Sequence, residues 1–227
     1  MTRPVVYIGC ALAVIALVFV FVPPVPQWDS YHLLADRRTI FGIPNFWNVV
    51  TNLPFLAAAA VGVRALRSKT AFCERWERAA FAVVVAGAAL VTAGSSWYHW
   101  NPTDATLVWD RLPMTLLFTA VFATILGDRL GLDTGQRLLA PVLLLGIASI
   151  VVWQTTGDLR LYGVVQYLPV LAIPLLLWFL PPRYTESRWL WGMCGLYGLA
   201  KTLELGDGWI GRFLSTGGHP WKHVAAA

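Results

Sequence analysis

Long runs of hydrophobic residues alternate along the chain with short polar segments, and the length of these runs decides its class. A helix needs about 20 mostly apolar residues to cross a bilayer. The fourth run reaches that length only if it takes in Asp110 and Arg111, and the seventh contains Lys201, Glu204 and Asp207. We predict an all-α integral membrane protein with seven transmembrane helices and no soluble domain. The seven runs are residues 4–28, 39–63, 79–103, 105–127, 138–157, 161–182 and 189–211.

The composition agrees with this class. Hydrophobic residues make up 57% of the 227 residues and charged residues 13%, whereas soluble domains carry roughly 25% charged residues. The net charge of +5 resides in short segments between the apolar runs, which is typical of membrane topology and excludes nucleic acid as a partner. Cys10, Cys73 and Cys194 are far apart without a C-x-x-C pair, so we interpret them as packing residues.

The distribution of Lys and Arg predicts the orientation. Basic loop residues gather on the cytoplasmic side of a membrane, and ten lie on the side of the N-terminus against five on the other. We therefore expect a cytoplasmic N-terminus. The first run has no small-x-small cleavage site, so we predict a retained helix rather than a signal peptide. The ten are Arg3, Arg64, Arg67, Lys69, Arg75, Arg78, Arg129, Arg137, Arg183 and Arg188; the five are Arg37, Arg38, Arg160, Arg212 and Lys222.

Three of the four histidines form a pattern with a serine and an aspartate. Ser95-x-x-x-His99 ends the third predicted helix, Asp110 opens the fourth, and His219-Pro-Trp-Lys-His223 follows the seventh. Residues four apart share one face of a helix, and the alternating topology brings all these groups to the outer interface. Ionisable groups at membrane depth are costly, so each needs a partner or a function.

Three neutral imidazoles with one open position describe a catalytic zinc site. Zinc lowers the pKa of a bound water to about 7 and polarises a carbonyl group. In such a site Asp110 would accept the proton of that water, and the Ser95 hydroxyl would hold the oxyanion or orient the water. Considered alone, His99 could belong to a belt of aromatic residues at the membrane interface, and His219 and His223 could lie in a solvated tail. Because all three are expected at the same interface, we favour a metal site.

The order of these motifs on seven helices resembles the alkaline ceramidase family, which belongs to a group of membrane hydrolases that includes the adiponectin receptors and the Per1-type proteins. Residues 42–55, G-I-P-N-F-W-N-V-V-T-N-L-P-F, are similar to the F-W-N-x-x-S-N segment of the family. D-R-L-P-M at 110–114 and K-x-x-E-x-x-D at 201–207 are similar to later family segments. The similarity runs from about Tyr31 to His223.

The resemblance implies a zinc-dependent amidase that hydrolyses ceramide or a related N-acyl lipid to a sphingoid base and a free fatty acid. The implied zinc ligands are His99, His219 and His223, with Ser95 and Asp110 as catalytic residues. Calcium, which eukaryotic members bind before the F-W-N segment, would here have only a weak site, with oxygen ligands from Asp29, Asp36 and Asn45. We expect Asp207 to hydrogen-bond a zinc-bound histidine from outside the ligand set.

The remaining polar residues have structural interpretations. Lys201 and Glu204 are three apart and are expected to form an internal ion pair. Asn48 and Asn52 are four apart and are expected to form hydrogen bonds across helices. His32 is interpreted as an interfacial residue rather than a fourth metal ligand.

We expect one domain over residues 1–227, in which residues 1–28 form an extra N-terminal helix, 29–45 an outer loop and 46–227 a ceramidase-like core whose last family helix is truncated. The expected location is a bacterial plasma membrane, with the active site at the outer face, a bilayer lipid as substrate and no protein partner. Two alternatives remain open. A Per1-type esterase or acyl-remodelling hydrolase would use the same zinc chemistry, and charges on the seventh helix also suit a receptor-like or transport protein with structural zinc.

Overall fold

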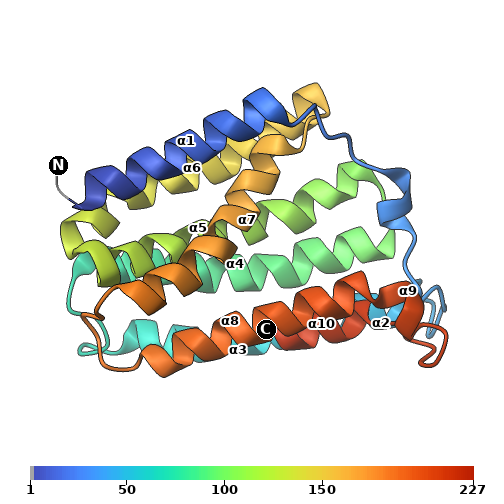
Figure 1. The fold of residues 1–227 in the computed structure, drawn as a ribbon. Helices are drawn as coiled ribbons and strands as arrows, with labels where there is room; N and C mark the ends of the chain where they lie inside the picture. Colours follow the sequence, from blue (N-terminus) through green and yellow to red (C-terminus); the bar gives the residue numbers. More distant parts are fainter. Residues whose placement is uncertain (1–2) are drawn as a thin grey trace.

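The computed structural model describes residues 3–227, and helices are its only regular elements apart from an isolated bridge between Ile40 and Ile43. Figure 1 shows the long helices lying side by side in one bundle. The all-α prediction is confirmed for this part of the chain. The elements are α1 (Arg3–Phe21), η1 (Asp29–His32), α2 (Phe46–Val50), α3 (Leu53–Arg67), α4 (Arg75–Trp100), α5 (Asp104–Leu130), α6 (Leu132–Thr156), α7 (Arg160–Phe179), α8 (Ser187–Leu205), α9 (Asp207–Ile210) and α10 (His219–Ala226).

Five helical segments are long and apolar enough to cross a membrane, which supports an integral membrane protein. They are Phe46–Arg67, Arg75–Trp100, Asp104–Leu130, Leu132–Thr156 and Arg160–Phe179. The other two predicted spans correspond to α1, whose described apolar stretch is Leu12–Phe21, and to α8, which carries Lys201 and Glu204. The count of seven therefore stays a prediction, although α1 and α8 run along the bundle with the other long helices (Figure 1).

The second predicted span begins later than the hydrophobic run suggested. Residues 39–45 form a tight loop, because Phe41, Gly42 and Asn45 adopt positive φ angles of 52°, 76° and 47°. Such left-handed residues do not continue a right-handed helix. The helix starts at Phe46 and breaks again between α2 and α3, where the buried Asn52 side chain donates to the carbonyl of Asn48 at 2.9 Å.

Helices α4 and α5 approach each other closely enough to place their polar ends together. At Gly94 an added Cβ would lie 1.8 Å from the carbonyl oxygen of Trp109, so no larger residue fits there. The chain turns between the helices at residues 101–103, and α5 begins with a capping box in which the Thr103 hydroxyl accepts from the Thr106 N–H at 3.2 Å. Ser95 directly follows Gly94, and Asp110 directly follows Trp109, so both residues are next to this contact in the sequence.

The chain returns from α8 through the short helix α9 to α10, which packs against α8, α2 and α3 (Figure 1). The prediction that His219–His223 is helical is confirmed, and Pro220 lies in the first turn, where its missing N–H is not needed. The turn before α10 needs glycine. Gly217 has a φ of 70°, and a Cβ on Gly218 would lie 2.2 Å from the carbonyl oxygen of Leu203.

Helix α1 contacts α7, and the segment after it is bound to the start of α7. The Asp158 carboxylate accepts from the Val25 N–H at 3.3 Å and pairs with the Arg160 guanidinium at 2.7 Å. That guanidinium also donates to the carbonyls of Phe19 and Val22 at 3.1 and 2.9 Å. The hydrogen bond from Arg160 holds the pKa of Asp158 below its usual range.

Candidate metal centre and substrate cavity

The three predicted histidine ligands converge. His99 comes from the last turn of α4, and His219 and His223 come from α10; all three are buried, and their candidate ligand nitrogens lie within 4.8 Å of one another. Nε2 of His99 is 3.3 Å from Nε2 of His219. Two nitrogens bound to one tetrahedral zinc at about 2.0–2.1 Å would lie about 3.3–3.4 Å apart. The arrangement therefore fits a metal ion held by three imidazoles.

The protonation of His223 is set by Thr51, at the break between α2 and α3. The Thr51 hydroxyl donates to the Trp47 carbonyl at 2.6 Å and lies 3.0 Å from Nδ1 of His223. With its own proton engaged, the hydroxyl accepts from Nδ1–H, which leaves Nε2 of His223 free to bind a metal. Thr51 was missed by sequence reasoning. The sequence did contain a signal for it, because Thr51 occupies the serine position of the F-W-N-x-x-S-N segment and keeps the hydroxyl group.

Asp207 lies beside the histidines, as expected, but it contacts main chain rather than an imidazole. Its Oδ1 accepts from the N–H groups of Gly218 and His219, both at 2.8 Å, and its Oδ2 accepts from the Ala35 N–H at 2.9 Å. A carboxylate is well placed at a helix N-terminus, where N–H groups lack partners inside the helix. Asp207 therefore positions the start of α10.

The three residues proposed for calcium are engaged in other contacts or give no sign of a shared site. The Asp36 carboxylate accepts from Arg38 Nε at 2.6 Å and from the Trp47 N–H at 2.9 Å. The Asn45 side-chain amide donates to the His99 carbonyl at 2.8 Å, which ties the loop to the end of α4. Asp29 lies in η1. The Asp36 contacts compete with a cation for the carboxylate oxygens, and the calcium site stays a prediction.

A cavity of about 1040 Å³ adjoins the histidine cluster, and Ser95, Asp110 and His223 all line it. Ser95 and Asp110 reach it from the neighbouring helices α4 and α5, and both residues are buried. The rest of the wall is mostly apolar and comes from α1, the segment after it, and helices α3, α4, α5, α7, α8 and α10. Such a cavity suits a lipid whose polar part reaches Ser95 and Asp110.

Comparison with known proteins agrees with this geometry. The family model described as ceramidase matches residues 40–196, which is most of the chain. The chain belongs to the ceramidase family. No curated protein and no solved structure gives a significant match. Family membership makes the protein a hydrolase of an amide bond with a lipid substrate, rather than a receptor-like or transport protein. The matched segment contains Ser95, His99 and Asp110 but ends before His219 and His223, which rest on geometry.

A charged network lies beside the histidine cluster. The predicted ion pair between Lys201 and Glu204 is confirmed, and Glu204 additionally accepts from Lys222 at 2.7 Å. Lys222 was counted as a loop residue in the sequence. Its contact arises because α10 packs back against α8 and brings Lys222 to the bundle interior.

The other polar residues have structural contacts. His32 Nδ1 lies 3.1 Å from the Tyr98 hydroxyl, and its Nε2 lies 3.1 Å from Asp104, which agrees with its interpretation as a residue outside the metal set. Asn48 donates to the Asp36 carbonyl at 3.4 Å. Asn48 therefore bonds the loop before α2 and Asn52 bonds its own segment, so the prediction of hydrogen bonds across helices was wrong for both residues.

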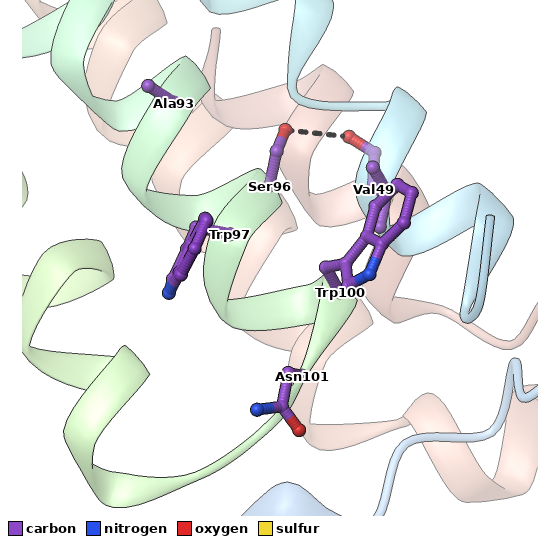
Figure 2. Close-up of a pocket in the computed structure, with 6 residues that line it drawn as sticks. All are labelled: Val49, Ala93, Ser96, Trp97, Trp100 and Asn101. Atoms are coloured by element: carbon purple, nitrogen blue, oxygen red, sulfur yellow. Dashed lines mark hydrogen bonds between the residues drawn. The ribbon is translucent and has the colours of Figure 1, made fainter.

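A second hollow lies on another face of α4 and is lined by none of the predicted site residues (Figure 2). The Ser96 hydroxyl donates to the Val49 carbonyl at 3.1 Å and ties α4 to α2. Trp97 and Trp100 are exposed beside it. Adjacent serines thus differ in role, since Ser95 lines the large cavity and Ser96 joins two helices.

Proposed function

We propose that this protein is a zinc-dependent membrane amidase that hydrolyses the amide bond of ceramide, or of a related N-acyl lipid, to a sphingoid base and a free fatty acid. One observation carries the proposal. Three buried imidazoles cluster beside a mostly apolar cavity, which His223, Ser95 and Asp110 line. Imidazole nitrogens suit zinc, and the apolar wall suits acyl chains.

His99, His219 and His223 would hold the ion, which when bound supplies an activated water and polarises the amide carbonyl. Asp110 acts as the proton carrier: its carboxylate accepts a proton from water and returns it to the amine that leaves when the C–N bond breaks. The Ser95 hydroxyl would donate to the developing oxyanion or orient the water. Burial of both residues excludes bulk water from this step.

The cavity wall supports a substrate that stays in the bilayer. Apolar side chains from α1, α5 and α7, among them Val14, Val18, Met114, Leu168 and Leu171, line the part available to acyl chains. We propose that residues 1–28 and 29–45 complete a single domain around the core of residues 46–227, with seven spans and a cytoplasmic N-terminus. The active site would then face the outer leaflet of a bacterial plasma membrane.

Metal analysis of the detergent-purified chain tests the ligand set. His219→Ala should lose bound zinc, because two nitrogens seldom hold zinc tightly in proteins. His32→Ala is the matched control and should keep it, since His32 lies outside the cluster. Zinc content at the wild-type level in His219→Ala would refute the assignment.

Turnover of ceramide tests the role of Asp110. Asp110→Asn should retain zinc and lose most hydrolysis, since general acid–base catalysis contributes about 10²–10⁴-fold to a rate. Fatty acid released at the wild-type rate would show that Asp110 is not the proton carrier. Release from phospholipid esters, with none from ceramide, would overturn the proposed substrate.

A further inference from the structure

The cavity wall contains a buried cation that the proposed mechanism does not use. Arg111 follows Asp110 in α5, lines the cavity and is only 4% exposed. Its guanidinium lies over the rings of Trp153 at 4.4 Å, Tyr162 at 4.6 Å and Tyr31 at 5.2 Å. Aromatic faces stabilise a cation in such positions, so the charge is held by an aromatic box of these three rings.

The hydrogen-bonding groups of this guanidinium are mostly unused. Nη2 donates to the Gln27 side-chain oxygen at 2.7 Å. Nε and Nη1 are buried and have no acceptor among residues 3–227. The site therefore lacks the acceptors that these two buried donors require. Burying a charge and its donors without a partner is costly.

The charges around the cavity make Arg111 unusual. Arg160 is paired with Asp158, and Glu204 accepts from both lysines. Among the basic residues that line the cavity, only Arg111 has no ion pair with a carboxylate of the described chain. The charged residues in the lining are Asp110, Arg111, Arg160, Lys201, Glu204 and Lys222, so cations exceed carboxylates there.

We propose that Arg111 binds an anionic group, a carboxylate or a phosphate, on the headgroup of the lipid substrate close to the scissile amide. The inference rests on the proposed amidase function and narrows its substrate to an anionic N-acyl lipid. A guanidinium binds a carboxylate or phosphate through two parallel hydrogen bonds. Such an anion is a stronger acceptor than the amide oxygen of Gln27, so it displaces Gln27 and occupies the unused donors.

The position of Arg111 sets the geometry of recognition. Arg111 and Asp110 line the same cavity from α5, so the anion would lie in the same chamber as the group that carries the proton. Tyr31 and Gln27 belong to the segment after α1, which is bound to the start of α7 through Asp158 and Arg160. The headgroup would thus lie under this segment, and the acyl chains would follow the apolar wall formed by α1 and α7.

The test compares two substrates that differ only by one phosphate group: a ceramide and the same ceramide with a phosphate on its headgroup. We expect the wild-type chain to hydrolyse the phosphorylated lipid with at least about 10-fold higher kcat/KM, which corresponds to one charge-assisted contact. Arg111→Gln should bring this ratio to about one. Arg111→Lys, which keeps the charge without the fork, should give an intermediate ratio.

The ratio separates recognition from folding, because a merely structural role would lower both rates together. A wild-type ratio near one, or a ratio unchanged in Arg111→Gln, would overturn the inference. It would also be overturned if the substitution altered only inhibition by added free fatty acid, since Arg111 would then bind the product. Gln27→Leu is the matched control and should keep the preference for the phosphorylated lipid.

A binding measurement separates this inference from the proposed function. Decyl phosphate should raise the Tm of the purified wild-type chain more than decanol does, and Arg111→Gln should abolish the difference. If neither ceramide is hydrolysed, the amidase proposal fails while this measurement still decides the anion site. If both are hydrolysed without preference and decyl phosphate has no effect beyond decanol, the anion site alone fails.

Discussion

The carboxylate of Asp207 holds the main-chain nitrogen of His219 at 2.8 Å and leaves the imidazole free for the metal. The same oxygen binds the Gly218 N–H, and the other oxygen binds the Ala35 N–H. Asp207 thus connects the loop before α2, the turn after α9 and the start of α10. Because both histidines of α10 depend on the direction of this helix, Asp207 orients two ligands at once.

Asp207→Ala should weaken zinc binding without removing a ligand. Loss of groups that orient metal ligands typically costs about 10–100-fold in affinity, and we expect a loss in this range, measured by competition with a chelator. Asp133→Ala, at the exposed start of α6, is the control and should keep wild-type affinity. Unchanged affinity in Asp207→Ala would show that α10 is oriented by other contacts.

Gly94→Ala should disturb the α4–α5 contact. Its Cβ would meet the Trp109 carbonyl oxygen at 1.8 Å, so the helices must separate. Overpacking of this kind costs about 1–3 kcal/mol, and separation would also move Ser95 away from Asp110. We expect a lower Tm and lower turnover.

Gly198→Ala provides the matched control for this prediction, because an added Cβ meets nothing within 4 Å at that position of α8. It should be neutral or stabilising by up to about 1 kcal/mol, since alanine favours a helix over glycine. Equal effects of the two substitutions on Tm and turnover would contradict the role given to the close contact.

Glu204→Gln should destabilise the bundle more than Lys201→Met does. Glu204 pairs with both Lys201 and Lys222, so its loss leaves two ammonium groups without a carboxylate. Breaking a buried pair costs about 3–5 kcal/mol. Because these side chains keep some exposure, we expect about 2–3 kcal/mol, measured by unfolding in detergent. Lys201→Met leaves the Glu204–Lys222 pair intact and should cost less; the reverse order would exclude Glu204 as the centre of the network.

The pair of Asp158 and Arg160 predicts a pH dependence. Arg160 lowers the pKa of Asp158 from its usual value of 3.8, so the pair stabilises the folded chain at neutral pH. This contribution is lost as the pH falls below about 4 toward the lowered pKa. Asp158→Asn should be less stable than wild type by about 1 kcal/mol at pH 7. The difference in Tm between the wild type and Asp158→Asn should disappear in acid. A difference that stays constant from pH 7 to pH 3 would contradict this prediction.

The helices and the cluster of three histidines could be predicted because their signals are local. The apolar runs set the helices, and the i, i+4 spacing of His219 and His223 set their common face. The second span was placed too early because a hydrophobic run does not report the left-handed backbone at Phe41 and Asn45.

Contacts that depend on the tertiary fold were not predictable. Thr51 meets His223 across 172 positions, and Gln27 meets Arg111 across 84. Trp153 could not be assigned from the sequence either. It lies near a helix end, as interfacial tryptophans do, but it is only 3% exposed and packs against Arg111. No local pattern distinguishes such a residue from one at the bilayer interface.

The distance of 120 positions between His99 and His219 has a consequence for biosynthesis. At roughly 5–20 residues per second, a ribosome would need about 6–24 s to proceed from one codon to the other. Helices α5 to α8 must be made and α10 placed against them before the coordination sphere exists. Metal loading would then follow the synthesis of α10, and it would join this helix to a part of the bundle that had already entered the bilayer.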